Sequence, residues 1–387
     1  MTDIILPKFM KFGPGSVKEI VPILKNIQCQ NPIIITDKTM VNLKIIDPLE
    51  QSLTTHQIRY TVFDNTIPEP TSQSIQEGVN AIKTGSYDCI IAFGGGSPID
   101  SAKAMSVLAN LGGEIRDYKF PHINIKSGIP LIAIPTTAGT GSEATKFTII
   151  TDEKTDEKML CVGPAFMPTA AIIDYELTFS VPKRTTADTA IDSLTHAIEA
   201  YVSKKANLFS DTQAISAMKL IAPNIRAAFK NGKDKEAREK LMIGATLAGI
   251  AFSNSSVALV HGMSRPIGAF YHVPHGLSNA MLLPTVTKFS IPSAKEKYAD
   301  CARAMGIAKA NDNDNDATKK LINELIKLNI DLQVPTLKDF GVNEEDFLNN
   351  LETMAVQAIA SGSPGNNPIV PSQDEVILLY KELWEKP

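Results

Sequence analysis

The sequence predicts an α/β N-terminal domain with a doubly wound, Rossmann-like sheet over residues 1–181, followed by an all-helical domain over residues 182–387. Three observations support this prediction. Short β-branched runs alternate with helical patterns in the first half. The strand signal disappears after Val181-Pro182, and 387 residues exceed the usual size of one hydrophobic core.

The first half contains four strand candidates, which are short apolar runs at residues 32–36, 58–63, 89–93 and 131–134. Helical patterns accompany them at residues 16–27, 39–53, 71–84 and 98–110. Strands and helices that alternate in this way form a mostly parallel sheet. The β-rich runs KFTIIT and KMLCV then flank the polar segment DEKTDE and precede AAIID, so we expect a β-hairpin and a last strand.

The second half shows only amphipathic helical periods, at residues 184–204, 209–230, 234–252, 277–289, 293–306, 316–329 and 372–384. No long linker separates the halves, so we expect the two domains to share a ligand-binding cleft.

Composition narrows the class of function. The net charge is −4 and no long basic run occurs, which argues against nucleic-acid or membrane partners and favours a small-molecule substrate. The four cysteines are scattered without a CxxC pair, no secretory signal is evident at the start, and no apolar run approaches about 20 residues. We therefore expect a cytoplasmic protein.

A glycine-rich loop follows the strand at residues 89–93. It contains Gly94, Gly95, Gly96, Ser97 and Pro98 and leads into a helical pattern. Glycines let a pyrophosphate approach the backbone, and the free N–H groups of a helix N-terminus bind it. The strict GxGxxG pattern is missing, so a plain strand-to-helix turn is the alternative.

A second loop of small hydroxylated residues, with Thr136, Thr137 and Thr140, follows the strand at residues 131–134. Two such loops at strand carboxyl ends favour a nucleotide site. Asp37 directly follows the strand at residues 32–36, where a carboxylate can bind ribose hydroxyls and repel a 2′-phosphate, which favours NAD over NADP. The alternative role for Asp37 is a helix cap.

Four residues in the second half suggest a metal site. Asp192 and His196 are four residues apart in a helical segment and so share a face. His261 and His275 lie in a stretch whose Gly and Pro residues allow one helix to end and another to begin. Three imidazoles and a carboxylate suit zinc or iron(II) and argue against calcium or magnesium. The alternative is a hydrogen-bonded helical pair with a capping histidine.

Several motifs together resemble the iron-containing (group III) alcohol dehydrogenases, a family that includes lactaldehyde reductases and 1,3-propanediol dehydrogenases. They are GGGSPIDSAKA at 94–104, PTTAGTGSE at 135–143, DSLTHAIE at 192–199 and HGMSRPIGAFYHVPHG at 261–276. The resemblance implies that the four residues above bind a metal and that the two loops and Asp37 contact the cofactor. Lys158 falls where the family has a lysine near the cofactor.

On this basis we expect an NAD(H)-dependent, metal-assisted alcohol dehydrogenase or aldehyde reductase that works as a homodimer or higher homo-oligomer. The ion would be iron(II) or zinc, with manganese as a further option. Asp100, inside the first motif, is an additional candidate catalytic residue.

The sequence departs from the family pattern at two positions. Many members have a histidine four residues after the third metal ligand, where this chain has Arg265, and Glu69 replaces the Asn of some relatives. Arginine cannot shuttle protons at neutral pH, so His272 or metal-bound water becomes the candidate proton relay. Arg265 could instead bind a carboxylate, sulfonate or phosphonate of the substrate, or pair with a structural carboxylate or the cofactor.

Two other functions compete with this interpretation. One is a lyase or cyclase resembling dehydroquinate synthase, in which NAD is regenerated during each turnover. The other is a non-catalytic NAD-binding sensor or scaffold that has kept the fold.

Overall fold

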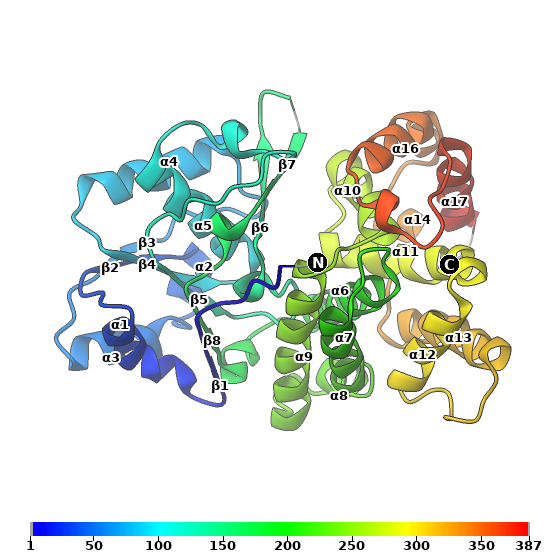
Figure 1. Ribbon diagram of the computed structural model, residues 1–387, viewed down its shortest axis with the longest axis horizontal. Coiled ribbons are helices and arrows are strands. Elements are labelled where there is room, and N and C mark those ends of the chain that lie inside the picture. Colours follow the sequence, from blue (N-terminus) through cyan, green and yellow to red (C-terminus); the bar gives the residue numbers. More distant parts are fainter. Residues whose placement is uncertain (1–2, 156, 386–387) are drawn as a thin grey trace. The chain divides into compact units, whose positions relative to one another are not determined.

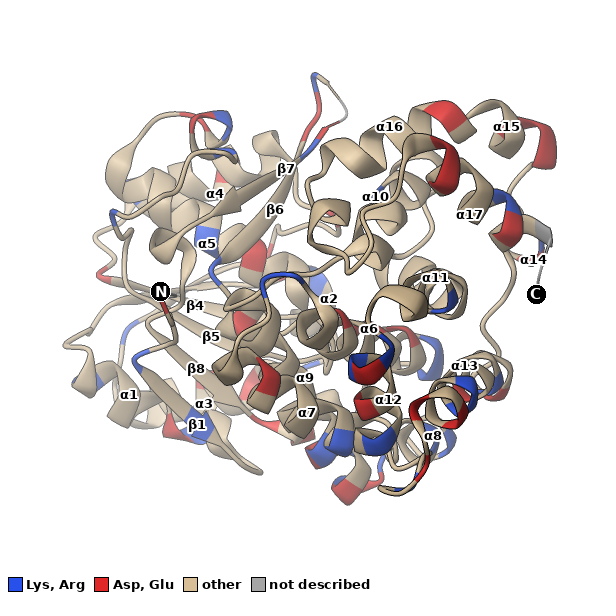
Figure 2. Ribbon diagram, turned by 45° about the vertical axis from the view of Figure 1, so that its right-hand side comes forward, with Lys and Arg blue, Asp and Glu red and all other residues tan. Residues whose placement is uncertain are grey.

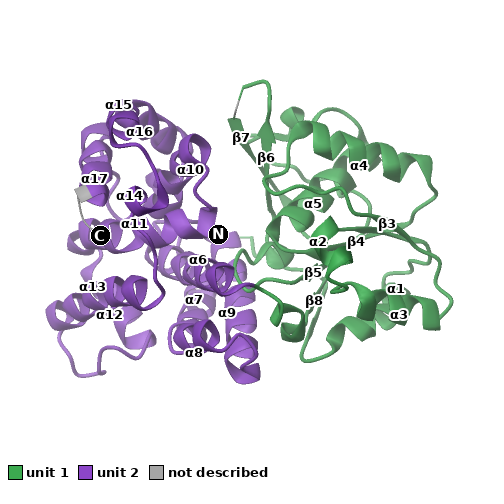
Figure 3. Cartoon of the chain, turned by 180° about the vertical axis from the view of Figure 1, so that it is seen from behind, with its two compact units in different colours: residues 1–181 green, residues 182–387 purple. Residues whose placement is uncertain are grey.

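The computed structural model describes residues 3–155 and 157–385. Its contacts divide the chain into two compact units, Met1–Val181 and Pro182–Pro387 (Figure 3). Each unit is described by itself below.

The first unit is built on a six-stranded parallel sheet in the order β1-β8-β5-β4-β2-β3. Its central strands β2, β4 and β5 are wholly buried because helices cover both faces of the sheet. One face packs on α1 and α3, and the other on α4 and α5 (Figure 1). The predicted α/β class is confirmed. The strands are β1 (Phe9–Phe12), β2 (Pro32–Ile35), β3 (Thr61–Phe63), β4 (Cys89–Gly94), β5 (Leu131–Pro135) and β8 (Ala170–Ile173).

The helices of the first unit follow the predicted segments with one clear exception. The helix expected at residues 39–53 is wrong, because the chain forms α2 (Lys38–Asn42) and α3 (Asp47–Thr55) with Lys44 at a φ of 57° between them. The others are α1 (Ile20–Asn26), α4 (Ser72–Thr84) and α5 (Gly96–Leu111).

The expected hairpin is present as β6 (Phe147–Asp152) and β7 (Glu157–Val162), which pair in antiparallel register. Residue 156, within the polar segment between the two strands, lies outside the described residues, as do residues 1–2 and 386–387 at the ends of the predicted domains.

The second unit is helical throughout its described residues, as predicted. Helix α6 packs against α7, α9 and α11, and so occupies a central position. The prediction of a single helix at residues 209–230 is wrong, since this segment forms two helices, α7 and α8, on either side of Pro223. The helices are α6 (Lys183–Val202), α7 (Leu208–Ile221), α8 (Ile225–Lys230), α9 (Lys235–Ser253), α10 (Leu259–Tyr271), α11 (His275–Ser290), α12 (Lys295–Ala304), α13 (Asp314–Asp331), α14 (Leu337–Phe340), α15 (Glu344–Asn349), α16 (Leu351–Ala360) and α17 (Gln373–Glu385).

Charged residues of both signs are interspersed on α12 and α13, whereas β4, β5 and β8 contain none (Figure 2). Among the described helices, none combines the length and apolar character that a membrane crossing requires.

Candidate functional site

Helix α6 presents the first two candidate metal ligands. Asp192 and His196 are one turn apart and are 2% and 5% exposed. The Oδ1 atom of Asp192 lies 3.9 Å from Nε2 of His196, so the two side chains share a face as their spacing predicts. The ring of Phe252, on α9, stacks on His196 with the centroids 4.4 Å apart and fixes the plane of the imidazole.

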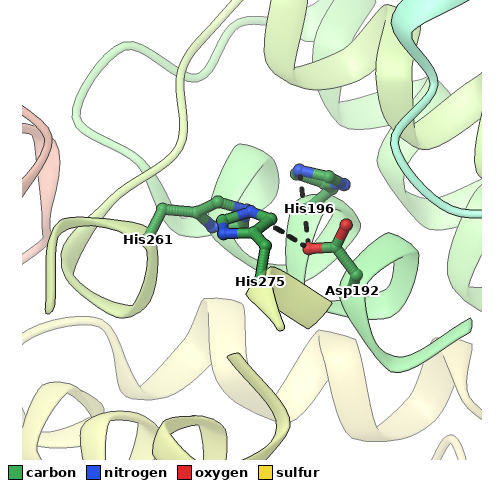
Figure 4. Close-up of side chains that lie close together, drawn as sticks. All are labelled: Asp192, His196, His261 and His275. Atoms are coloured by element: carbon green, nitrogen blue, oxygen red, sulfur yellow. Dashed lines mark ion pairs between the residues drawn. The ribbon is translucent and has the colours of Figure 1, made fainter. Parts of the chain in front are cut away.

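Helices α10 and α11 bring the other two ligands to the same point. His261 lies in the first turn of α10, which ends where His272 adopts a left-handed conformation with a φ of 54°. The chain then turns and begins α11 at His275. The Nε2 atoms of His261 and His275 lie 3.5 and 3.7 Å from Oδ1 of Asp192 (Figure 4).

The four side chains fit a divalent ion. Their ligand atoms all lie within 4.8 Å of one another. A tetrahedral ion bonded at about 2.1 Å separates its donor atoms by about 3.4 Å, close to the observed spacing. Burial opposes ionisation of Asp192, but the imidazoles of His196, His275 and His261 hold its pKa well below the usual range. Asp192 is therefore an ionised carboxylate at neutral pH.

Glu199 supports this cluster and was not found from the sequence. Its Oε2 atom lies 2.5 Å from Nδ1 of His261 and accepts a hydrogen bond from the N–H of Ala258 at 2.9 Å, while Oε1 accepts one from Val260 at 2.6 Å. A carboxylate at Nδ1 leaves Nε2 as the atom that faces a metal. The spacing of Glu199, seven residues after Asp192 and so two turns along one face of a helix, was the available signal.

Asn279, one turn into α11, also contacts the ligands and was missed. Its Nδ2 atom donates to Oδ1 of Asp192 at 2.7 Å and lies 3.3 Å and 3.2 Å from Nε2 of His261 and His275. It is fully buried. The four-residue spacing from His275 places it on the ligand face of α11.

Arg265 lies one turn after His261 and is half-buried. Burial lowers its pKa, which the charge of Glu199 opposes. Its Nη1 atom donates to the carbonyl of Ser361 at 3.4 Å. Within residues 3–155 and 157–385, no carboxylate lies within 4.0 Å of this guanidinium. The alternative in which Arg265 pairs with a structural carboxylate therefore has no support within these residues.

The two remaining candidate catalytic residues lie in different surroundings. His272 is an exposed residue at the end of α10. Asp100 is half-buried in the first unit, where it accepts hydrogen bonds from Ser142 Oγ at 2.5 Å and from the N–H of Ile149 at 3.1 Å. Burial raises its pKa, although Lys103, Ser142 and Ile149 act in the opposite direction. Asp100 thus links α5 to the loop that follows β5, which contains Thr136, Thr137 and Thr140.

The predicted cofactor loops meet at the carboxyl ends of β4 and β5. The N–H of Thr136 donates to the carbonyl of Gly94 at 2.9 Å. A Cβ atom at Gly95 would lie 3.5 Å from Oγ1 of Thr137, and one at Gly96 would lie 2.8 Å from Cγ2 of Thr140. Pro98 closes the turn, since a Cβ on Gly94 would come within 2.7 Å of its ring.

This part of the first unit fits a pyrophosphate. The N-cap of α5, Gly95, offers no side-chain cap, so the first N–H groups of a 16-residue helix, including that of Ser97, remain available to an anion. Thr136, Thr137 and Thr140 surround the same loop.

Asp37 takes one of the two roles that its position suggested, the helix cap. Its Oδ1 atom caps α2 by accepting hydrogen bonds from Thr39 and Met40 at 2.8 and 3.1 Å. Its Oδ2 atom faces the glycine loop, 3.6 Å from where a Cβ of Gly94 would lie.

Lys158, in β7, forms an ion pair with Glu69, at 2.9 Å between Nζ and Oε1. Glu69 has a φ of 52°, in the left-handed region that Asn adopts more readily than Glu. The two family positions that the sequence singled out independently are therefore partners.

Comparison with known proteins decides the family. A profile for iron-containing alcohol dehydrogenases matches residues 7–175, and a profile for the C-terminal part of the Fe-containing alcohol dehydrogenase family matches residues 186–384. The chain belongs to the iron-containing alcohol dehydrogenases. It is therefore an alcohol dehydrogenase-type oxidoreductase, and use of NAD and iron is typical of its family.

Three similar proteins illustrate the relationship. Lactaldehyde reductase of Escherichia coli (strain K12) is 34% identical over 98% of this chain and 99% of its own length. A 1,3-propanediol oxidoreductase structure superposes with a TM-score of 0.94 at 31% identity, covering 99% of this chain and 100% of the other. The sulfoacetaldehyde reductase of Bifidobacterium kashiwanohense, solved with NAD⁺, has a TM-score of 0.89 at 27% identity and covers both chains fully, at 100% each.

Proposed function

We propose that the chain interconverts a small primary alcohol and its aldehyde, mainly as an aldehyde reductase, with NAD(H) and one divalent metal ion. The observation that carries the proposal is the convergence of three imidazole nitrogens on Oδ1 of Asp192, in a member of an alcohol dehydrogenase family. Asp192, His196, His261 and His275 would hold the ion.

A divalent ion bound there would polarise the aldehyde oxygen and stabilise the negative charge that develops on it. The residues of the chain prepare this chemistry. Glu199 fixes the ring of His261, and Asn279 orients the carboxylate of Asp192 by donating to it. The aldehyde can approach beside His275, whose side chain is 42% exposed and is the open member of the cluster.

The first unit would bind the cofactor. The uncapped N-terminus of α5 is a site for the pyrophosphate, with Gly94, Gly95, Gly96 and Ser97 in contact. The Oδ2 atom of Asp37, which faces the glycine loop, would accept a hydrogen bond from the adenosine ribose, which favours NAD over NADP.

Metal removal tests the proposal. Dialysis against a chelator should abolish NADH oxidation with small aldehydes, and iron(II) or zinc should restore it. The variant Asp192→Asn should bind less metal and lose activity, whereas Asp188→Asn, one turn earlier on α6, should keep its metal. Full activity in a metal-free sample, confirmed by elemental analysis, would overturn the proposal.

The NADH assay also distinguishes a dehydrogenase from the competing lyase or cyclase, which the family relationship does not favour. A lyase regenerates its NAD and gives no steady change in NADH absorbance. Elemental analysis of anaerobically purified protein would distinguish iron(II) from zinc and manganese. Analytical ultracentrifugation would test our expectation of a homodimer or higher homo-oligomer.

We further propose that the preferred aldehyde carries an anionic head group, a sulfonate, phosphonate or carboxylate, bound by Arg265. Support comes from a half-buried guanidinium on the helix that supplies His261, which donates a hydrogen bond to a carbonyl and has no carboxylate within 4.0 Å among the described residues. Burying a cation without an anion is costly, and a substrate anion would relieve that cost. The similar sulfoacetaldehyde reductase is named for such a substrate.

The test compares Arg265→Gln with Arg59→Gln, which removes an exposed arginine from the first unit. Arg265→Gln should lower kcat/KM for sulfoacetaldehyde by about 10- to 100-fold, the loss expected for a charge-assisted hydrogen bond. The value for neutral propionaldehyde should change little. Equal losses on both aldehydes would remove the anion-binding role and leave the metal-dependent reaction intact.

A further inference from the structure

The first unit contains a second cluster of metal-binding side chains, which the proposed reaction does not use. Cys29 lies just before β2, and Asp88 and Cys89 lie where β4 begins. Strands β2 and β4 are parallel neighbours with Pro32 opposite Cys89, which brings the two segments together. The Sγ atom of Cys29 lies 3.6 Å from the carbonyl oxygen of Asp88.

The donor atoms are close enough to share one ion. Both sulfurs and a carboxylate oxygen of Asp88 lie within 4.8 Å of one another. A tetrahedral ion bonded to thiolates at about 2.3 Å holds their sulfurs about 3.8 Å apart. Two thiolates select a thiophilic ion such as zinc or cadmium over magnesium or calcium.

The carboxylate is already positioned. Oδ2 of Asp88 accepts a hydrogen bond from the N–H of Gln30 at 2.7 Å, and Oδ1 accepts one from Asn31 at 2.9 Å. Each oxygen keeps a further lone pair. Because Asp88 is exposed while Cys29 and Cys89 are 5% and 0% exposed, an ion can reach the thiols from the carboxylate side.

The two thiols also interact with each other. Their hydrogen bond lowers the pKa of Cys29, against the opposing effects of burial and of Asp88, and raises the pKa of Cys89. Binding of a divalent ion would form two metal–sulfur bonds and release the two thiol protons to water.

We propose that Cys29, Cys89 and Asp88 form a second metal site for a thiophilic divalent ion, with water as the remaining ligand. The site lies at the amino ends of β2 and β4, whereas Asp37 and Gly94 lie at their carboxyl ends. Five residue steps along β4 separate Cys89 from Gly94, or about 16 Å. An ion there would join the turn before β2 to the start of β4 without blocking the cofactor loops.

Cadmium titration tests this proposal, because a cadmium–thiolate bond has an ultraviolet charge-transfer band. The cluster at Asp192 contains no sulfur and cannot produce that band. The chelator-treated, reduced full chain should develop the band and saturate it with one thiolate-bound cadmium. Native mass spectrometry should then find one cadmium fewer in Cys29→Ser than in the unmodified chain, and Cys29→Ser should lose the band.

Cys161→Ser is the matched control, since Cys161 is another fully buried thiol of the same unit but lies outside the cluster. This variant should keep the band, and Asp88→Asn should require more cadmium to reach it. NADH turnover of Cys29→Ser should match the unmodified chain. The proposal is overturned if the unmodified, reduced chain shows no band or if Cys29→Ser retains it. Asp88 is exposed, so Asp88→Asn still tests the site if a cysteine variant fails to fold.

Discussion

Replacing Glu199 by Gln should weaken both the second unit and its metal site. The carboxylate accepts hydrogen bonds from two backbone N–H groups at the start of α10, where the N-cap residue Ala258 has no side-chain cap of its own. Gln has nearly the same shape but only one acceptor oxygen. At least one buried donor therefore loses its partner, at a cost of about 1–3 kcal/mol in the free energy of unfolding.

The affinity of the site for its metal ion should also fall, for a different reason. Loss of the carboxylate at Nδ1 of His261 should lower metal affinity by about 10- to 100-fold, as for other carboxylates that orient a metal-bound histidine. Urea unfolding of the metal-free chain measures the first effect, and competition with a chelator of known affinity measures the second. Glu352→Gln, an exposed change on α16, is the control.

The stability measurement and the metal-affinity measurement test the two roles of Glu199 separately. Reduced stability with unchanged metal affinity would mean that Glu199 only caps α10. Unchanged values of both would refute the reasoning from the hydrogen bonds at 2.5–2.9 Å.

Three further predictions concern the first unit. Burial lowers the pKa of Lys103 to about 8, although Asp100 and Glu143 oppose the shift, so between pH 8 and 10.5 the folded chain binds fewer protons than the unfolded chain. The cost of burying the charge is complete below pH 8 and disappears as the pH rises. The unfolding free energy of the unmodified chain, compared with Lys103→Met, should therefore increase by about 3 kcal/mol across that range, and a flat difference in pH-dependent urea unfolding would contradict this. Gly94→Ala should raise the Kd for NADH in fluorescence titrations, because Gly94 has a φ of 148° and its Cβ would meet Pro98; an unchanged Kd would argue against cofactor binding at this loop. Asp37→Asn should keep the cap of α2, and so the melting temperature, while reducing the preference for NADH over NADPH; an unchanged preference would leave Asp37 as a cap alone.

The predictable part of the fold rests on strong local signals. The wholly buried strands β2, β4 and β5 are continuous apolar runs, and their sequences alone predicted a parallel sheet. Strand β1 was missed because FMKF is short and half-exposed at the sheet edge. The helix expected at residues 39–53 was wrong because its apolar spacing continues through a break at Lys44, which is defined by backbone conformation rather than by hydrophobicity.

The candidate site, too, was predictable only where the signal is local in the sequence. Spacing on one helix correctly placed Asp192 beside His196, because that geometry is local. Glu199 and Asn279 carry no distinctive motif, and their contacts with the ligands form only when α6, α10 and α11 pack together. Whether Asp100, His272 and Arg265 act in catalysis stays a prediction.

The ion pair of Glu69 and Lys158 engages the lysine that the family resemblance places near the cofactor. Glu69 occupies a left-handed conformation that is less favourable for Glu than for Asn, and its side chain is 53% exposed, so the ion pair itself adds little stability. The pair instead neutralises the charge of Lys158 locally. A change of Glu69 to Asn, the residue of some relatives, would relax the backbone and leave Lys158 able to pair with another anion.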